Sequence, residues 1–168
     1  QGFFGVFPWQ VLQAWIFTYM VEERGFNEGV SMVIMLVWLL SMIIGNLVGG
    51  MLGDMLFKRN IRGRAILGAV DVFLSAPALY FTIMWPMEDI FGFTVIGTIA
   101  SFILPMAGPN VSAAVMDIAE PEVRSSADAF RRIFEYGGSS AAPLISGYLA
   151  DMYGLGLGTL YISVTTWI

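Results

Sequence analysis

The chain of 168 residues is 57% hydrophobic and only 12% charged, with a mean hydropathy of +0.75. Soluble domains carry about 25% charged residues, so the composition indicates an integral membrane protein of the all-α class. The sequence contains no Cys and no His, which excludes disulfides, thiolate chemistry, Cys/His zinc sites and histidine-dependent catalytic triads. The net charge of −5 says little about partners, because the charged residues lie between apolar runs.

Six apolar segments are long enough, or nearly so, for helices that cross a bilayer, which takes about 20 residues. They cover residues 3–20, 30–52, 65–85, 91–116, 127–150 and the stretch from 159 onward. The sequence therefore predicts a polytopic bundle of six transmembrane helices in a single unit, residues 1–168. Because the chain starts at the edge of one apolar segment and stops inside another, we expect it to be a piece of a longer protein.

Lysine and arginine are distributed unequally between the two sides of these segments. Seven of the eight fall after the second segment, after the fourth, or at the start of the fifth: Lys58, Arg59, Arg62, Arg64, Arg124, Arg131 and Arg132. Because cytoplasmic loops carry the excess of basic residues, we expect loops 54–64 and 117–125 to be cytoplasmic. We expect the protein to lie in the plasma (inner) membrane.

The second segment carries glycines at Gly45, Gly49 and Gly53, one every four residues and therefore on one helix face. In lipid, such a stripe of small residues lets two helix backbones approach closely. We expect this face to pack against another helix. The fourth segment contains Pro105 and Pro109, which remove backbone donors and can bend a helix.

Charged residues inside the apolar segments are costly unless they are paired or hydrated. Glu135 lies about seven residues into the fifth segment and four residues after Arg131, on the same helix face. It either forms a structural ion pair with Arg131, or serves as a protonatable group or a substrate contact. Asp71, one or two turns into the third segment, is expected to pair with Arg64 or Arg132.

Three amides are further candidates for lining a cavity. Gln10 and Gln13 lie three residues apart on one face of the first segment, and amides rarely face lipid. Asn110 follows Pro109 and could line a path or join two helices. No metal-ligand pattern and no Gly-x-x-x-x-Gly-Lys-Ser/Thr nucleotide-binding loop occurs, so we expect no metal, no cofactor and no nucleic-acid partner.

Two similar elements close the second and fifth segments. "GMLGD" covers residues 50–54 and "GYLAD" covers residues 147–151, and both read Gly-x-Leu-small-Asp. They put two sets of three helices in register, about 1–85 and 86–168. Because each set has an odd number of crossings, the second is inverted relative to the first. Inverted three-helix repeats are one construction of secondary transporters.

The stretch "GGMLGDMLFKRN" resembles the cytoplasmic-loop signature of the major facilitator superfamily. The residues that fit it are Gly50, Leu52, Gly53, Asp54, Lys58 and Arg59. Met55 and Phe57 depart from it, because a basic residue and a glycine are usual at those positions. "AEPEVRSSADAF" and "ISGYLADMYG" are similar to the entry and exit of the matching helix in the second repeat. The family has two six-helix halves, and the degenerate signature and the extended opening favour the C-terminal half.

The resemblance implies a secondary transporter, a symporter or antiporter that moves a small organic solute by alternating access, and not an enzyme. Its partners would be the solute, the lipid bilayer and the other six-helix half of the same protein. In the family the acid at the position of Asp54 latches the two halves, which implies a gating role for Gly50, Asp54, Lys58 and Arg59. Without the resemblance, Asp54 would cap a loop and the basic residues would only fix topology.

Two other functions fit the composition. One is a non-transporting membrane receptor or scaffold that keeps the transporter fold. The other is a membrane-embedded enzyme, which fits less well because the chain has no histidine. An aspartyl enzyme would need two acids at facing depths, and Asp71 with Glu135 is a poor pair for that purpose.

Overall fold

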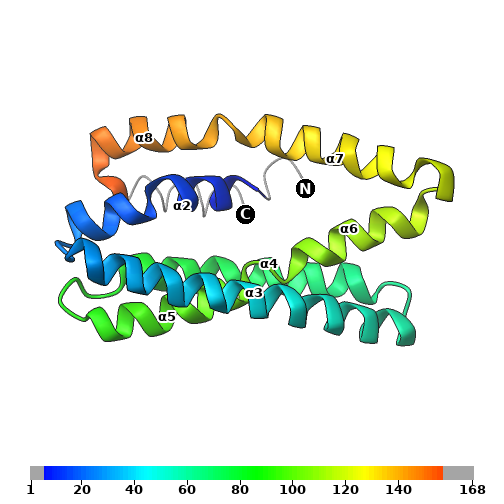
Figure 1. The fold of residues 1–168 in the computed structure, drawn as a ribbon, viewed down its shortest axis with the longest axis horizontal. Coiled ribbons are helices and arrows are strands. Elements are labelled where there is room, and N and C mark those ends of the chain that lie inside the picture. Colours follow the sequence, from blue (N-terminus) through cyan, green and yellow to red (C-terminus); the bar gives the residue numbers. More distant parts are fainter. Residues whose placement is uncertain (1–5, 157–168) are drawn as a thin grey trace.

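A computed structural model describes residues 6–156, and the regular structure in this range is helical (Figure 1). Three helical stretches are long and apolar enough to cross a membrane: α3 (Glu28–Arg59), α4 (Gly63–Met84) and the combined stretch Ile90–Ile118. The combined stretch consists of α5 (Ile90–Ile103) and α6 (Ala107–Ile118). These helices indicate a membrane-embedded protein. The sixth expected segment, from residue 159, lies outside the described residues.

Two further helical stretches correspond to the first and fifth expected segments. Helix α2 (Phe7–Thr18) continues into a π-helical turn, η1 (Tyr19–Glu23). After a short 3-10 turn, η2 (Pro121–Val123), the chain forms α7 (Arg124–Ser139) and α8 (Ala142–Tyr153). Helices α3, α4 and α5 form one layer, and α7 and α8 lie end to end in a second (Figure 1). Helix α2 lies between the layers and packs on α8, while α6 leaves the first layer to reach α7.

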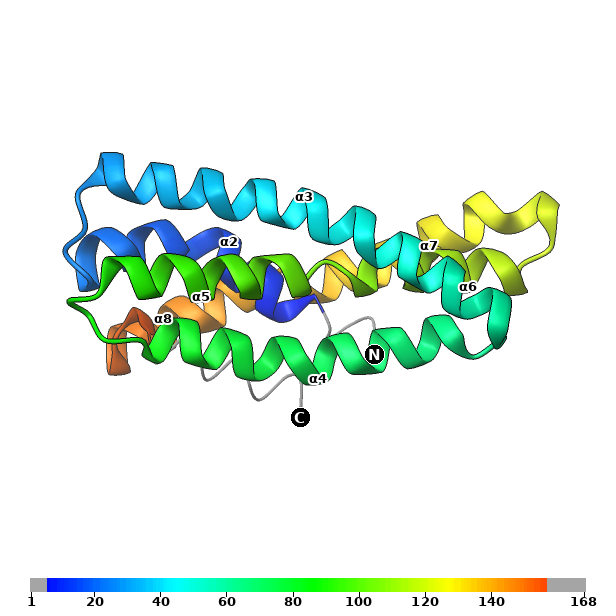
Figure 2. The same cartoon turned by 90° about the horizontal axis from the view of Figure 1, so that it is seen from below.

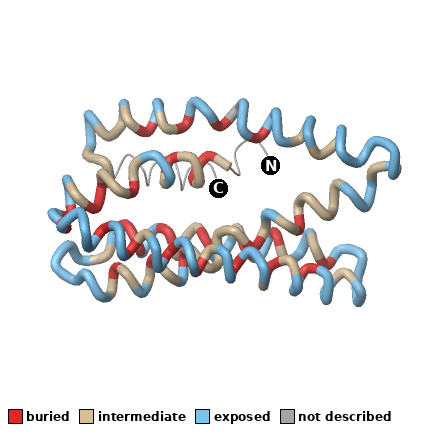
Figure 3. Tube along the Cα trace, viewed as in Figure 1, coloured by how far each residue is buried: buried red, intermediate tan, exposed pale blue. Residues whose placement is uncertain are grey.

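Helix α3 has the reverse polarity of a helix in a soluble protein. Its buried face is made mostly of small and polar residues: Ser31, Ile34, Trp38, Ser41, Gly45, Gly49 and Gly53. Its opposite face carries large apolar side chains that are more than half exposed: Leu36, Leu40, Ile44, Leu47 and Met51. The buried positions gather where α3, α4 and α5 meet (Figure 3). A continuous exposed apolar face of this kind suits contact with lipid.

Helix α3 runs parallel to the α5–α6 stretch, and α5 lies between α3 and α4 (Figure 2). The contacts between α3 and α5 repeat about every four residues. The Trp38 indole N–H donates to the carbonyl of Thr94 at 3.1 Å. The Ser41 hydroxyl donates to the carbonyl of Thr98 at 2.8 Å. Polar side chains thus bond to carbonyls of the facing helix, which fixes the register of the two helices.

The glycine stripe of α3 continues this register towards the end of α5. A Cβ atom at Gly45 would overlap the backbone of Phe102, and one at Gly49 would overlap the backbone of Met106. The two backbones therefore approach each other more closely than any other residue type would allow. Dispersion contacts between backbones take the place of the hydrophobic effect, which does not drive helix association in lipid.

Helix α3 continues to Arg59, beyond residue 52, where the apolar run ends. Its 32 residues span about 48 Å and so exceed the roughly 30 Å hydrocarbon core. Asp54, Lys58 and Arg59 therefore lie on its last turns, and the expected loop 54–64 is wrong. Only residues 60–62 connect α3 to α4. The expected loop 117–125 is also shorter, because α6 and α7 both extend into it. A run of charges marks the membrane edge but does not end a helix.

The fourth expected helix is interrupted between α5 and α6. Pro105 and Pro109 have no backbone N–H to continue the helical pattern. The Met106 N–H bonds back to the carbonyl of Ile103, three residues earlier, at 2.9 Å. In an unbroken helix the same carbonyl would accept from Ala107. The interruption therefore leaves the Ala107 N–H for a partner outside the helix.

Buried Arg24 holds the other end of the bundle together. Its guanidinium donates to carbonyl oxygens at the end of α4: Trp85 at 2.6 Å, Pro86 at 3.2 Å and Ile83 at 3.3 Å. It also lies 4.0 Å from the centre of the Phe93 ring of α5. The carbonyl end of a helix is the negative end of its dipole, and an aromatic face also attracts a cation. Arg24 thus connects the η1 turn to two helices.

Asp89 caps the N-terminus of α5, outside the apolar stretches. Its carboxylate accepts from the Gly92 N–H at 2.8 Å and from the Trp85 indole N–H at 3.0 Å. These donors, the Gly92 amide first, hold the pKa of Asp89 below its ordinary value. The stability that the cap contributes is therefore present above the ordinary carboxyl range and is lost as the pH falls through the lowered pKa.

The close approach of the helices can be tested with two neighbouring glycines of α3. A Cβ at Gly50 would meet Pro109 at 3.7 Å, an ordinary contact, whereas one at Gly49 would overlap the Met106 backbone. We expect Gly49→Ala to lower the free energy of unfolding by about 1–3 kcal/mol. Gly50→Ala should be neutral, or stabilising by up to about 1 kcal/mol. Unfolding in detergent measures both, and equal midpoints would contradict the close approach.

Candidate functional site

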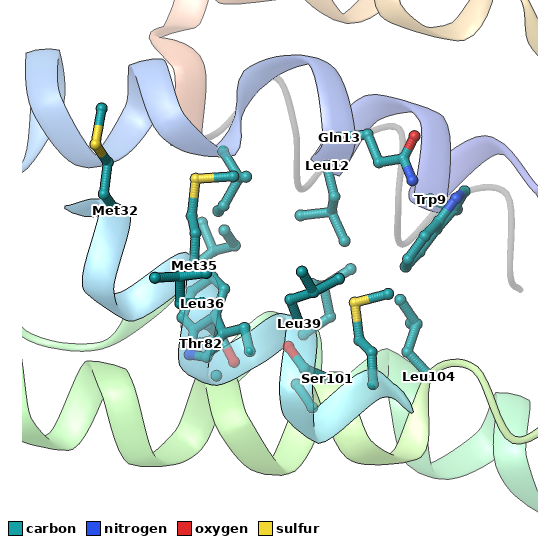
Figure 4. Close-up of a pocket in the computed structure, with 17 residues that line it drawn as sticks. Trp9, Leu12, Gln13, Met32, Met35, Leu36, Leu39, Thr82, Ser101 and Leu104 are labelled. Carbon is teal, nitrogen blue, oxygen red and sulfur yellow. The ribbon is translucent and has the colours of Figure 1, made fainter. Parts of the chain in front are cut away.

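Two cavities lie between the two layers of helices. The first, which we call the apolar cavity, has a volume of about 690 Å³ and is lined by α2, α3, α4 and α5. Its wall includes Trp9, Gln13, Leu39, Thr82 and Ser101 (Figure 4). Gln13 thus faces a cavity, whereas Gln10 lines neither of the two.

The second cavity has a volume of about 700 Å³ and lies at the interruption between α5 and α6. Four helices contribute to its polar lining, which includes Asn46 of α3, Asp71 of α4, Ser112 of α6, and Arg131, Arg132, Glu135 and Tyr136 of α7. We call it the charged cavity. Pockets that hold small molecules have volumes of roughly 300–1,000 Å³ and a few placed polar groups, and this cavity has both properties.

Arg131 is the centre of an ionic network on α7. One of its amino groups donates to both oxygens of Glu135, at 2.6 and 2.5 Å. The other donates to Asp128 and to the Ser112 hydroxyl of α6, each at 2.8 Å. Glu135 is buried, and this geometry is the ion pair that the sequence offered as one of its two interpretations. A protonatable role for Glu135 stays a prediction.

The network is electrically neutral. Arg132 donates to the second oxygen of Asp128 at 2.8 Å, so two arginines are matched by Asp128 and Glu135. The sequence pattern gave the pair four residues apart but missed Asp128, which lies three residues before Arg131, and Ser112 on another helix. The contact with Ser112 ties α7 to α6 beside the cavity.

Asp71 is paired differently from the sequence prediction. Its side chain is buried, and one carboxylate oxygen accepts from the Ala107 N–H, at 3.2 Å, the donor that the interruption leaves free. The expected pairing with Arg64 or Arg132 is wrong, because both arginines are engaged with other acids. The other oxygen, Oδ1, has no hydrogen-bond partner among residues 6–156. Asp71 thus caps a helix start across the bundle.

Asn110 joins helices and does not line the charged cavity. Its side-chain amide is buried and donates to the carbonyl of Gly49 at 2.9 Å and to that of Met106 at 2.8 Å. A Cβ at Gly53 would overlap this amide. The third glycine of the stripe therefore makes room for the asparagine that links α3 to the start of α6.

A second ionic cluster lies where α3 and α6 end and α4 begins. The Arg64 guanidinium donates to Asp54 at 2.7 Å and, through its other amino group, to Asp117. Its flat face lies 4.3 Å from the centre of the Phe57 ring. Phe57, one of the departures from the family signature, thus provides the surface on which Arg64 stacks. We call this the Asp54 cluster.

The other members of the expected motif lie outside the Asp54 cluster. Lys58 and Arg59 are exposed on the last turn of α3, and neither forms an ion pair within residues 6–156. Gly50 lies beside Pro109 of α6. The arginine that reaches Asp54 comes from the next helix, and the acid that completes the cluster, Asp117, comes from α6. Charges at neighbouring helix ends on one side were the only sequence signal for this grouping.

Within the described residues, no group of three or more Asp, Glu, His or Cys side chains is placed to hold a metal ion. Comparison with known proteins found no matching family model, no similar curated protein and no similar solved structure. The functional assignment therefore depends on the geometry of the two cavities and the Asp54 cluster, together with the sequence signature.

The Asp54 cluster predicts different effects of two nearby arginines. Asp54 and Asp117 have side chains that are 62% and 40% exposed, so water screens the ion pairs. We expect Arg64→Gln to lower the free energy of unfolding by about 1 kcal/mol at low salt, and by less in 1 M salt. Arg62→Gln, at an exposed position, is the matched control and should have little effect. Unfolding in detergent at two salt concentrations tests this, and equal effects at low salt would contradict the cluster.

Proposed function

We propose that this chain is one six-helix half, the C-terminal one, of a secondary transporter of the major facilitator type. It would move a small organic solute by alternating access, with its helices arranged as two inverted sets of three, about 1–85 and 86–168. The observation that carries the proposal is the charged cavity of about 700 Å³ beside an interrupted apolar helix. A scaffold needs no cavity of this size with ionic groups in its wall.

Interrupted helices support the proposal. Irregular backbone at membrane depth is tolerated where it is buried in protein or lines a cavity. Transporters use such interruptions to present backbone groups to solutes and ions near the middle of the membrane. Here Pro105, Ala107 and Pro109, at the α5–α6 interruption, line the charged cavity. A second interruption separates α7 from α8 at residues 140–141.

The Asp54 cluster supports a gate at the end of the bundle that the basic residues predict to be cytoplasmic. In the state described here, Asp54 bonds to Arg64 within the same half. We infer that in another state this carboxylate exchanges Arg64 for a helix start of the other half, as the family resemblance implies. Lys58 and Arg59, exposed at the same end, are available to the other half.

Transport can be tested with the full-length protein in proteoliposomes. Vesicles are given a soluble metabolite extract outside and an imposed proton or sodium gradient, and accumulated solutes are identified by mass spectrometry. The proposal predicts accumulation of a small organic solute that depends on the gradient and on the protein. A folded, correctly inserted protein that accumulates nothing under either gradient would contradict the proposal.

The role of Asp54 is tested in the same vesicles. An ion pair worth about 1 kcal/mol changes the balance between two states by roughly fivefold. We therefore expect Asp54→Asn to change the transport rate by about fivefold without loss of inserted protein. Asp151→Asn removes the same charge at an exposed position of α8 and is the matched control. An unchanged rate in Asp54→Asn would remove the gating role.

A further inference from the structure

We propose that the charged cavity binds an organic cation, with the positive centre of the solute on the side of the Asp71 carboxylate. This inference rests on the proposed function, because it names the substrate class of the same cavity. Three observations support it: the charges of the cavity wall together with their ion-pair partner Asp128, the unpartnered oxygen of Asp71, and the apolar and aromatic groups of the wall.

The charge balance leaves one negative charge over. Arg131 and Arg132 are matched by Asp128 and Glu135 through ion pairs of 2.5–2.8 Å. Asp128 lies outside the cavity lining but bonds to both arginines, so these four charges sum to zero and leave no free positive charge in the described lining for an anion. Asp71 is the remaining charged residue of the cavity lining. The cavity therefore favours a solute that carries a positive charge.

Asp71 is a buried acid beside the cavity, and one of its oxygens is unpaired within the described part of the chain. The residue is 4% exposed. Its Oδ2 accepts from the start of α6, where the helix dipole stabilises negative charge. Its Oδ1 has no partner within residues 6–156. An ionised acid buried in a membrane protein is costly unless a counter-charge is present, and a bound cation supplies that counter-charge.

The rest of the wall suits the apolar body of an organic cation. Trp9 and Tyr136 line the charged cavity together with Met42 and several aliphatic residues. Aromatic faces attract cations, and methionine adapts to ligands of different shape. Trp9, Met42 and Leu104 also line the apolar cavity, so a solute with an apolar extension has further space available on the same side of the bundle.

Two ions of matched shape and opposite charge provide the test. Tetraphenylphosphonium and tetraphenylborate are titrated into the full-length protein in detergent, and their binding to empty micelles is subtracted. The wild type should bind the cation and not the anion. Asp71→Asn keeps an acceptor for the Ala107 N–H but removes the charge, and should weaken binding of the cation by about tenfold or more. Asp151→Asn, with the same change in net charge, should bind it as the wild type does.

Each outcome decides the proposal. Equal binding of both ions by the wild type, which requires no variant to fold, would overturn it. Unchanged binding of the cation in a folded Asp71→Asn would also overturn it. If Asp71→Asn left cation binding unchanged but abolished the proton dependence of transport, Asp71 would be a proton site instead. Cation binding without flux would support the cation site and contradict the transporter proposal. Flux of another solute without cation binding would support the transporter proposal and contradict the cation site.

Discussion

The close approach of α3 to the α5–α6 stretch positions the rest of the first layer. At Gly45 and Gly49 the backbone of α3 lies where a side chain would overlap Phe102 and Met106. Lipid offers no hydrophobic force to hold helices together, so close backbone packing and hydrogen bonds between helices have to do so. The contact spans the end of α5 and the start of α6, which fixes the interruption in one place against a continuous helix.

The polar groups of the charged cavity are arranged around that fixed interruption. Prolines remove donors from the helix, the tight turn frees the Ala107 N–H, and the carboxylate of Asp71 accepts it. Helix α6 then diverges from the layer and carries Ser112 to the ionic network on α7. The cavity keeps one acid without a basic partner within residues 6–156, since the two arginines in its wall are already paired with other acids.

Features within one helix could be predicted from the sequence, whereas the partner residues in contacts between helices could not. The four-residue period of the glycines and the four-residue spacing of Arg131 and Glu135 are properties of single helices. The structure contains both the close-packed glycine face and the ion pair. The partners of Asp71 and Arg64 depend on how four helix ends meet, and apolar periodicity does not encode that arrangement. The predicted end of the second segment, residue 52, is wrong for a related reason. Charged residues indicate where the membrane surface lies, but the backbone hydrogen bonds of α3 continue to Arg59. The sequence also contained no indication that Arg64 stacks on Phe57.

Alternating access, the central claim, makes a direct prediction about the charged cavity. A single cysteine at Asn46, in the cavity wall, is exposed in the full-length protein to a membrane-impermeant thiol reagent applied from one side of the membrane at a time. Cysteines at Lys58 and Glu88, at opposite ends of the bundle, define the two sides. Alternating access predicts that the cysteine at position 46 reacts from both sides, whereas each end position reacts from one. Reaction of position 46 from only one side, under every gradient and solute condition, would contradict it.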